Sequence, residues 1–253
     1  MTVVLAGVAA DGGNVHPVPE RGADGRFEYV PIPESEPTTE TATYGSLPRR
    51  HGDGALDSLL SYVQPGSDPD RRTRPVGDVP VHRDPNFEHL TYGEPRRGYV
   101  ERLAALEPGD VVAFYGGLRE GERKHRYLLG YFTVREAVDF RGLSAAEREA
   151  AFEAHPENAH AKRHFAGADT RDRLVVVDGT DPAALFERTT ARLSTFDRFG
   201  NSQYYLDDAF ADRFRVRSPD HAPGDPVWLG FKPAVECALS AAAFRERLPD
   251  GTF

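Results

Sequence analysis

Two long apolar runs separated by a short charged segment dominate the hydrophobic pattern of the chain, within residues 106–138. The first run covers residues 111–115 and ends at Gly116-Gly117, and the second covers residues 127–134. Runs of this length bounded by glycine and charged residues are typical of strands, so the pattern predicts a β-hairpin. Both runs are apolar at nearly every position. They therefore predict strands covered on both faces, as in a small barrel or a sheet packed under helices.

Shorter elements flank this hairpin. Strands are predicted over residues 2–8 and 173–179, and residues 15–18 can pair with residues 27–32 as a second hairpin. Periodicity and capping residues predict helices over residues 55–63, 97–106, 144–155, 182–192 and 237–247. Residues 34–78 are rich in Pro, Asp, Thr, Gly and Arg and predict a long loop-rich segment. The pattern as a whole predicts one α+β domain with an N-terminal extension.

Composition narrows the class of protein. Hydrophobic residues make up 39% of the 253 positions, which is enough for a core, while a net charge of −9 argues against general binding of polyanions. The excess of acidic residues and the scarcity of lysine resemble a high-G+C or moderately halophilic proteome. The single cysteine, Cys237, excludes an intrachain disulfide and a cysteine-based zinc cage. With no signal peptide and no apolar run near the ~20 residues that span a membrane, a cytoplasmic location is expected.

A glycine-rich turn follows the first predicted strand. Asp11, Gly12, Gly13 and His16 stand together there, and such turns can cradle a phosphate or sugar with backbone N–H groups. The glycine spacing is not a dinucleotide fingerprint, and Pro17 forbids the helix that should follow. The alternative is a plain turn with an Asx cap.

His82 and Asp84 lie two positions apart on an extended segment, so their side chains point to the same face. The pair can polarise a water, bind a metal or hold a substrate hydroxyl, or it can be a structural contact before Pro85. Asn158 and His160 stand in a second polar group. If these residues converge with Asp11 and His16, the site would suit acid–base chemistry or a carboxylate–imidazole metal site. No hydrolase elbow, P-loop, zinc helix or kinase loop is present.

Polar residues beside the hairpin form a further candidate site, because loops held by a rigid scaffold often carry function. These are Arg119, Lys124, His125 and Arg126, and the alternative is that they only solubilise the hairpin tip. A later aromatic group can stack on a nucleobase or belong to the core: Phe196, Phe199, Tyr204 and Tyr205.

Three stretches together resemble the nucleotide modification associated domain 3 family, which is associated with DNA base hypermodification in phages and prokaryotes. The residues that carry the resemblance are Asp11-Gly12-Gly13 to Pro17 with Asp24-Gly25-Arg26 and Pro31-Ile32-Pro33, His82-Arg83-Asp84-Pro85-Asn86-Phe87 with Tyr92-Gly93, and Pro108-Gly109-Asp110 through Phe114 to Arg119 and Gly130-Tyr131-Phe132, followed by Asn158-Ala159-His160. The resemblance implies a single domain of this kind over residues 1–253. It supplies a context, DNA modification or defence, and not a reaction.

The middle of the chain is also similar to PUA-like domains of the EVE or ASCH kind, which are small barrels that hold a modified base beside such a hairpin. This likeness implies an α+β fold with a PUA-like mixed β-barrel core and flanking helices. It implies a base pocket lined by Tyr115, Gly116, Gly117 and Arg119, with Asn158 and His160 nearby.

The resulting hypothesis is a protein that binds or processes a modified base or nucleotide, with a nucleotide or modified nucleic acid and other proteins of a DNA-modification system as partners. We expect Asp11, His82 and Asp84 to be the catalytic acid–base group. The expected substrate-binding residues are Gly12, Gly13, His16, Tyr115, Gly116, Gly117, Arg119, Asn158 and His160. No metal is assigned and the cofactor is left open. The alternatives are a non-catalytic reader of modified nucleic acid and a partner-binding accessory protein.

Overall fold

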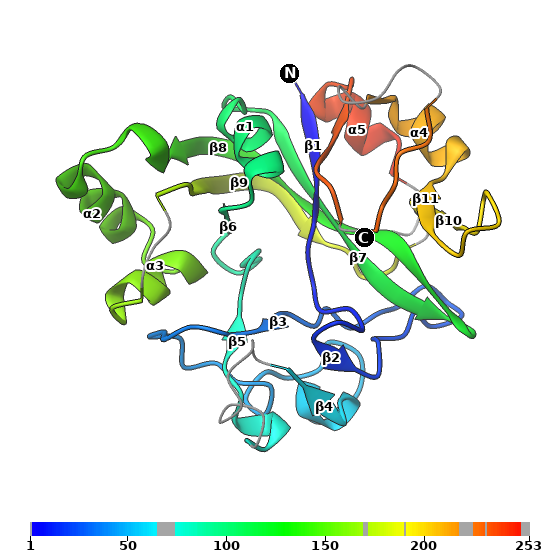
Figure 1. Cartoon of the computed structure of the whole chain (residues 1–253), viewed down its shortest axis with the longest axis horizontal. Helices are drawn as coiled ribbons and strands as arrows, with labels where there is room; N and C mark the ends of the chain where they lie inside the picture. The colour runs from blue at the N-terminus through cyan, green and yellow to red at the C-terminus, as the bar shows by residue number, and fades with distance from the viewer. Residues whose placement is uncertain are drawn as a thin grey trace.

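A curved, mixed sheet of seven strands forms the centre of the computed structural model (Figure 1). The structure describes residues 2–64, 74–168, 172–189, 191–217, 225–230 and 232–248. The strand order is β12-β13-β1-β7-β8-β9-β6, in which β1 and β7 are parallel and the other neighbours are antiparallel. The strands are β1 Val3–Gly7, β6 Thr91–Glu94, β7 Val111–Glu120, β8 Arg123–Asp139, β9 Val175–Leu185, β12 Val216–Arg217 and β13 Val235–Cys237.

The predicted central hairpin is confirmed as β7 and β8. Val111 pairs with Thr133 at its base, and Glu120 pairs with Arg123 at its tip. Residues 111–118 of β7 are all buried, as the continuous apolar run predicts for a strand covered on both faces.

The sheet curls around an aromatic core without closing. Tyr92 in β6 packs edge-on against Phe114 in β7 with ring centroids 5.2 Å apart, although β8 and β9 lie between these strands in the sheet. Phe132 in β8 contacts the Phe114 ring, with centroids 4.8 Å apart. In the described part of the chain β12 and β6 remain separate edges, so the sheet is open. The α+β class is confirmed, whereas the expected closed barrel is not found.

Five helices surround the sheet in the described residues (Figure 1). They are α1 Arg97–Ala104, α2 Ala145–Ala154, α3 Ala159–Phe165, α4 Asp208–Phe214 and α5 Ala241–Glu246. The predictions for α1 and α2 are confirmed, and that for residues 237–247 is confirmed in part, since Cys237 ends strand β13. The helix predicted over residues 182–192 is wrong, because β9 continues to Leu185 and pairs with β8; Thr190 lies outside the described residues. None of the described helices is both long and apolar enough to cross a membrane.

An N-terminal extension lies below the sheet in Figure 1 and has a hydrophobic cluster of its own. Its paired strands are β2 Val15–His16 with β4 Tyr62–Val63, and β3 Ile32–Pro33 with β5 Val81–His82. The hairpin predicted between residues 15–18 and 27–32 is wrong, because β2 pairs with the more distant β4. The helix predicted over residues 55–63 is a short 3-10 turn, Leu56–Leu59, followed by β4. Residues 65–73 of the predicted loop-rich segment lie outside the described residues.

The remaining elements are local. They are the strand pair β10 Ser194–Phe196 and β11 Tyr204–Leu206 and the 3-10 turns Val76–Asp78 and Phe140–Gly142.

Candidate functional site

Four buried polar side chains from separate parts of the chain meet between the extension and the sheet. We call them the imidazole–carboxylate cluster: Glu34, His82, Asp84 and His160. His82 Nδ1 lies 2.9 Å from a Glu34 oxygen, and His82 Nε2 lies 3.6 Å from Asp84 Oδ2. His160 Nε2 lies 3.3 Å from the same Asp84 oxygen. The exposed fraction of each of the four residues is 8% or less.

Local structure explains why these side chains meet. The pairing of β3 with β5 brings Glu34, which follows β3, next to His82. The Asn158 side chain caps α3 by accepting a hydrogen bond from the His160 backbone N–H, which places His160 in the first helical turn. Gly93 donates its N–H to Asp84 Oδ1 at 2.8 Å. A Cβ at position 93 would lie 2.5 Å from the His160 ring, so only glycine allows this approach.

The cluster is charged and shifts the pKa of each member. Burial raises the pKa of Glu34, but hydrogen bonds from His82 and from Arg163 outweigh it and lower the pKa to about 2. Burial also raises the pKa of Asp84, and hydrogen bonds from His160 and His82 reverse that change and lower the pKa. For His82, burial lowers the pKa and the two carboxylates raise it above its ordinary value. For His160, burial prevails and lowers the pKa.

An unpaired hydroxyl lies in the same region. The Tyr29 hydroxyl oxygen is buried and has no hydrogen-bond partner among the described residues. Burial raises the pKa of this hydroxyl, and the charge of Asp84 raises it further. The Tyr29 ring packs edge-on against Phe87 with centroids 5.4 Å apart. Buried polar atoms in folded proteins nearly always have a partner, so this hydroxyl is a candidate contact for a bound molecule or ion.

A second group of charged side chains surrounds the glycine-rich turn. We call it the cationic cluster: Asp11, Lys124, Arg126 and Lys232. The Asp11 carboxylate lies 3.3 Å from Lys232 Nζ and 3.7 Å from Lys124 Nζ, and it accepts a hydrogen bond from Arg126. With all members ionised, one carboxylate faces three cations, which leaves an excess of two positive charges. Arg126 Nε is buried and has no hydrogen-bond partner among the described residues.

Close packing and burial shape this cationic cluster. A Cβ at Gly117 would lie 2.7 Å from an Arg126 nitrogen and 2.9 Å from Asp11, so glycine is required there. Lys232 Nζ donates to the Val8 and Ala9 carbonyls, each at 2.8 Å. Burial lowers the pKa of Lys232 to about 8; the Asp11 charge opposes this change and the Arg126 charge adds to it.

The structure divides the predicted site between these two clusters. His82, Asp84, His160 and Asn158 come together at the imidazole–carboxylate cluster. Asp11 lies instead in the cationic cluster. The described residues show no hydrogen bond or ion pair between the two clusters.

The other predicted binding residues have varied positions. Beside the cationic cluster, Gly12 lies near Lys124, Gly13 donates its N–H to the Asp11 carbonyl, and Gly116 lies against the Val8 carbonyl and the Ala9 methyl group. Tyr115 is fully buried and donates its hydroxyl to the Pro233 carbonyl at 2.6 Å. His16 is exposed in β2, and Arg119 pairs with Glu20 at the end of β7.

Sequence reasoning missed Glu34, Tyr29, Arg163 and Lys232. Glu34 stands in a proline-rich stretch with no local pattern, and Lys232 is one of only three lysines, which is its only distinguishing signal. Lys124 and Arg126 belong to the candidates at the hairpin tip.

One short segment connects the clusters. The Ala10 N–H donates to the Val30 carbonyl at 2.8 Å beside Asp11, and Glu34 follows four residues later. Four extended residues span at most about 14 Å. The segment therefore limits the separation of its own two ends, one beside Asp11 and one beside His82.

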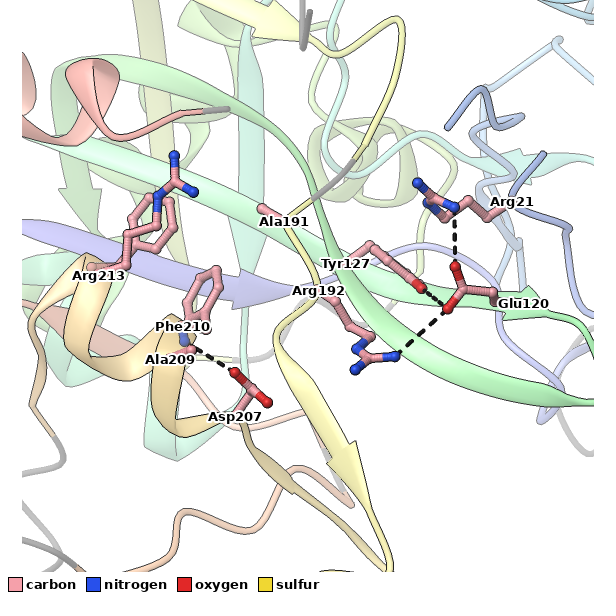
Figure 2. Close-up of a pocket in the computed structure, with 10 residues that line it drawn as sticks. Arg21, Glu120, Tyr127, Ala191, Arg192, Asp207, Ala209, Phe210 and Arg213 are labelled. Atoms are coloured by element: carbon pink, nitrogen blue, oxygen red, sulfur yellow. Dashed lines mark hydrogen bonds and ion pairs between the residues drawn. The ribbon is translucent and has the colours of Figure 1, made fainter. Parts of the chain in front are cut away.

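Cavities border these groups. One of about 200 Å³ is lined in part by Glu34, and one of about 700 Å³ is lined in part by Arg83, next to Asp84, and by Lys162 of α3. A separate open cavity of about 390 Å³ lies between the hairpin and α4 (Figure 2). There Glu120 pairs with Arg21 at 3.0 Å and Arg192 at 3.7 Å and accepts the Tyr127 hydroxyl, as Figure 2 shows. This cavity contains none of the predicted site residues.

Comparison with known proteins gives a family match. The model of the nucleotide modification associated domain 3 family matches residues 2–246, a span that includes both clusters and the segment between them. No curated protein and no solved structure matches the chain.

Proposed function

Since the chain belongs to the nucleotide modification associated domain 3 family, we propose that it is an enzyme that binds a nucleotide and processes its base, free or within a nucleic acid. The family links the chain to nucleotide modification systems. The proposal assigns phosphate binding to the cationic cluster and the reacting groups to the imidazole–carboxylate cluster.

The observation that carries the proposal is the excess of positive charge around Asp11. Three cations converge on one carboxylate in a chain whose net charge is −9. Partly buried charges without a counter-charge are costly, and a bound phosphate would offset that cost through charge-assisted hydrogen bonds. The adjacent glycine-rich turn adds backbone N–H groups of the kind that line anion sites. In this proposal Asp11 positions Arg126 and Lys232 for the phosphate, and it takes no part in proton transfer.

The reacting groups are proposed to be His82, Asp84 and His160. A buried network of this kind is weak as a device for stability, because desolvation offsets most of its Coulomb attraction. Two imidazoles around one carboxylate can move protons or hold an ion next to a substrate. The segment from Val30 to Glu34 joins the surroundings of the two groups, since Ala10 donates to the Val30 carbonyl and His82 contacts Glu34.

The decisive experiment is mass spectrometry of nucleosides from host DNA and RNA, with and without the gene. We expect a nucleoside to change in the deletion strain, and to return with the wild-type gene and with the exposed-surface control Arg97→Ala. The gene with Asp84→Asn should fail to restore it. The gene with Lys124→Ala should also fail, because the proposal assigns phosphate binding to Lys124.

The alternative outcome is equally definite. An unchanged nucleoside profile, together with tight binding of a modified oligonucleotide by the purified protein, would refute the enzyme and identify a reader. An unchanged profile with no such binding would leave an accessory role in the same system.

A further inference from the structure

We propose that His82, Asp84 and His160 bind one divalent first-row transition-metal ion. This inference deepens the proposed function and rests on its placement of the reacting groups in the imidazole–carboxylate cluster. The ligand atoms would be Nε2 of both histidines and Oδ2 of Asp84.

The first support is the spacing of these three atoms. Ligands about 2.1 Å from a metal ion lie roughly 3.0–3.4 Å apart in octahedral or tetrahedral geometry. The Asp84 oxygen lies 3.3 Å from His160 Nε2 and 3.6 Å from His82 Nε2, and all three atoms lie within 4.8 Å of one another. The two rings are nearly perpendicular, with centroids 5.2 Å apart. The two imidazole nitrogens and the carboxylate oxygen therefore lie close enough together to share one ion.

The second support is the set of contacts behind the ligands. Metal-bound histidines commonly donate their other ring N–H to a carboxylate, which fixes the tautomer. His82 does so through Nδ1 to Glu34 at 2.9 Å, and Arg163 holds Glu34 in turn at 2.7 Å. The Gly93 N–H occupies the other oxygen of Asp84, which leaves Oδ2 for the ion.

The third support is the buried Tyr29 hydroxyl, which has no partner among the described residues. The Tyr29 ring packs against Phe87, three residues after Asp84. A water on the metal ion would give this hydroxyl a hydrogen-bond partner. A cavity of about 200 Å³ is lined in part by Glu34, the carboxylate behind His82.

The ligand types define the chemistry of the ion. Two imidazoles and one carboxylate are the ligand set of catalytic zinc sites with an open fourth position, and also of non-haem iron(II) sites. Zinc and iron(II) sites with these ligands both keep a coordination position open for water or substrate. Hard ions such as Mg²⁺ prefer oxygen ligands and are disfavoured here.

A second group, Glu136, His155 and Asp178, has similar residue types but lacks these supports. His155 Nε2 lies 3.7 Å from Glu136, whose side chain is 54% exposed, and Arg135 already binds Asp178. It therefore provides a matched control, since His155→Ala removes the same kind of side chain.

The test measures metal content in the purified full-length protein by mass spectrometry, before and after chelation and reloading with Zn²⁺, Fe²⁺ or Co²⁺. We expect about one ion per chain in the wild type and in His155→Ala, and under about a tenth of that in His160→Ala and Asp84→Asn. The ion retained after purification distinguishes zinc from iron, because the order of affinities on reloading follows the Irving–Williams series in either case. A wild-type protein that binds none of the three ions would overturn the inference, as would equal loading of His160→Ala.

A spectroscopic readout covers the case in which a variant does not fold. Paramagnetic Co²⁺ should broaden and shift the imidazole signals of His82 and His160 far more than those of His155 in the wild type; the reverse pattern refutes the site. If the wild-type protein binds metal but the Asp84→Asn strain has normal nucleosides, the proposed function alone is refuted. If the wild-type protein binds no metal but the Asp84→Asn strain has altered nucleosides, this inference alone is refuted.

Discussion

The buried ammonium group of Lys232 makes stability depend on pH in a way that one substitution removes. Burial lowers its pKa from 10.5 in the unfolded chain to about 8 in the folded protein. Between these values the unfolded state binds more protons, so stability rises with pH. A difference of one between the folded and unfolded pKa corresponds to about 1.4 kcal/mol, so the full effect is about 3 kcal/mol, of which about 1.3 kcal/mol develops between pH 7 and pH 9.

The assay is urea unfolding of the wild type and Lys232→Met at pH 7, 8 and 9, followed by circular dichroism. Loss of the hydrogen bonds to the Val8 and Ala9 carbonyls lowers the free energy of unfolding of the variant by the same amount at every pH. The free energy of unfolding of the wild type should therefore gain about 1.3 kcal/mol on the variant from pH 7 to pH 9.

Lys162→Met is the matched control. Burial lowers the Lys162 pKa, but hydrogen bonds with Glu157 and Glu40 outweigh it and raise the pKa above 10.5. A raised lysine pKa contributes stability that is fully present below 10.5, so this variant should show no relative change between pH 7 and pH 9. Parallel curves for the wild type and Lys232→Met would refute the depressed pKa and weaken the case for an excess of positive charge.

Three other contacts can be tested by single substitutions or by pH. Gly93→Ala should displace the His160 ring, lower metal content in the loading assay and cost about 1–3 kcal/mol, whereas Gly98→Ala, with open space around it, should not. Tyr127→Phe should lose the hydrogen bond to Glu120 and cost about 0.5–1.5 kcal/mol in urea unfolding, and an unchanged midpoint would contradict a formed bond. Binding of a nucleoside monophosphate, measured by calorimetry, should weaken up to about tenfold from pH 7 to pH 9 as Lys232 loses its proton, and constant affinity would exclude that lysine from the phosphate site.

Elements with local signals could be predicted from the sequence. The capping box of α2 needs only Ser144 and Glu147, and both of its hydrogen bonds form. The central hairpin needs only two apolar runs and a polar tip. In both cases the deciding contacts lie within the same stretch of chain.

Elements decided by distant partners could not be predicted in this way. Pro182 at a helical first turn favours a helix, yet Ala184 and Leu185 pair with Tyr131 and Gly130 of β8. Val15 pairs with Val63, although residues 27–32 are nearer in sequence. Sheet pairing supplies each strand with hydrogen-bond partners that local propensity does not describe.

The same distinction applies to the site. The two-residue spacing of His82 and Asp84 indicates a shared face, and their side chains do lie together. The partner that orients His82 is Glu34, and the cation that holds Glu34 is Arg163, 129 positions away. A single sequence contains no signal for such long-range pairs. For the same reason the sequence could not show that Asp11, expected beside His82, lies instead among Lys124, Arg126 and Lys232.

Under the proposed function, the segment between Val30 and Glu34 connects two clusters that share no hydrogen bond or ion pair among the described residues. Pro31 and Pro33 fix two of its backbone φ angles, and the Pro31 carbonyl accepts the Tyr44 hydroxyl at 2.7 Å. Val30 is tied to the glycine-rich turn at one end, and Glu34 is tied to His82 at the other. A stiff connection anchored at both ends would keep the distance between the proposed phosphate site and the proposed reacting groups constant. The spacing of the two clusters would then select ligands by length, independently of which base is bound.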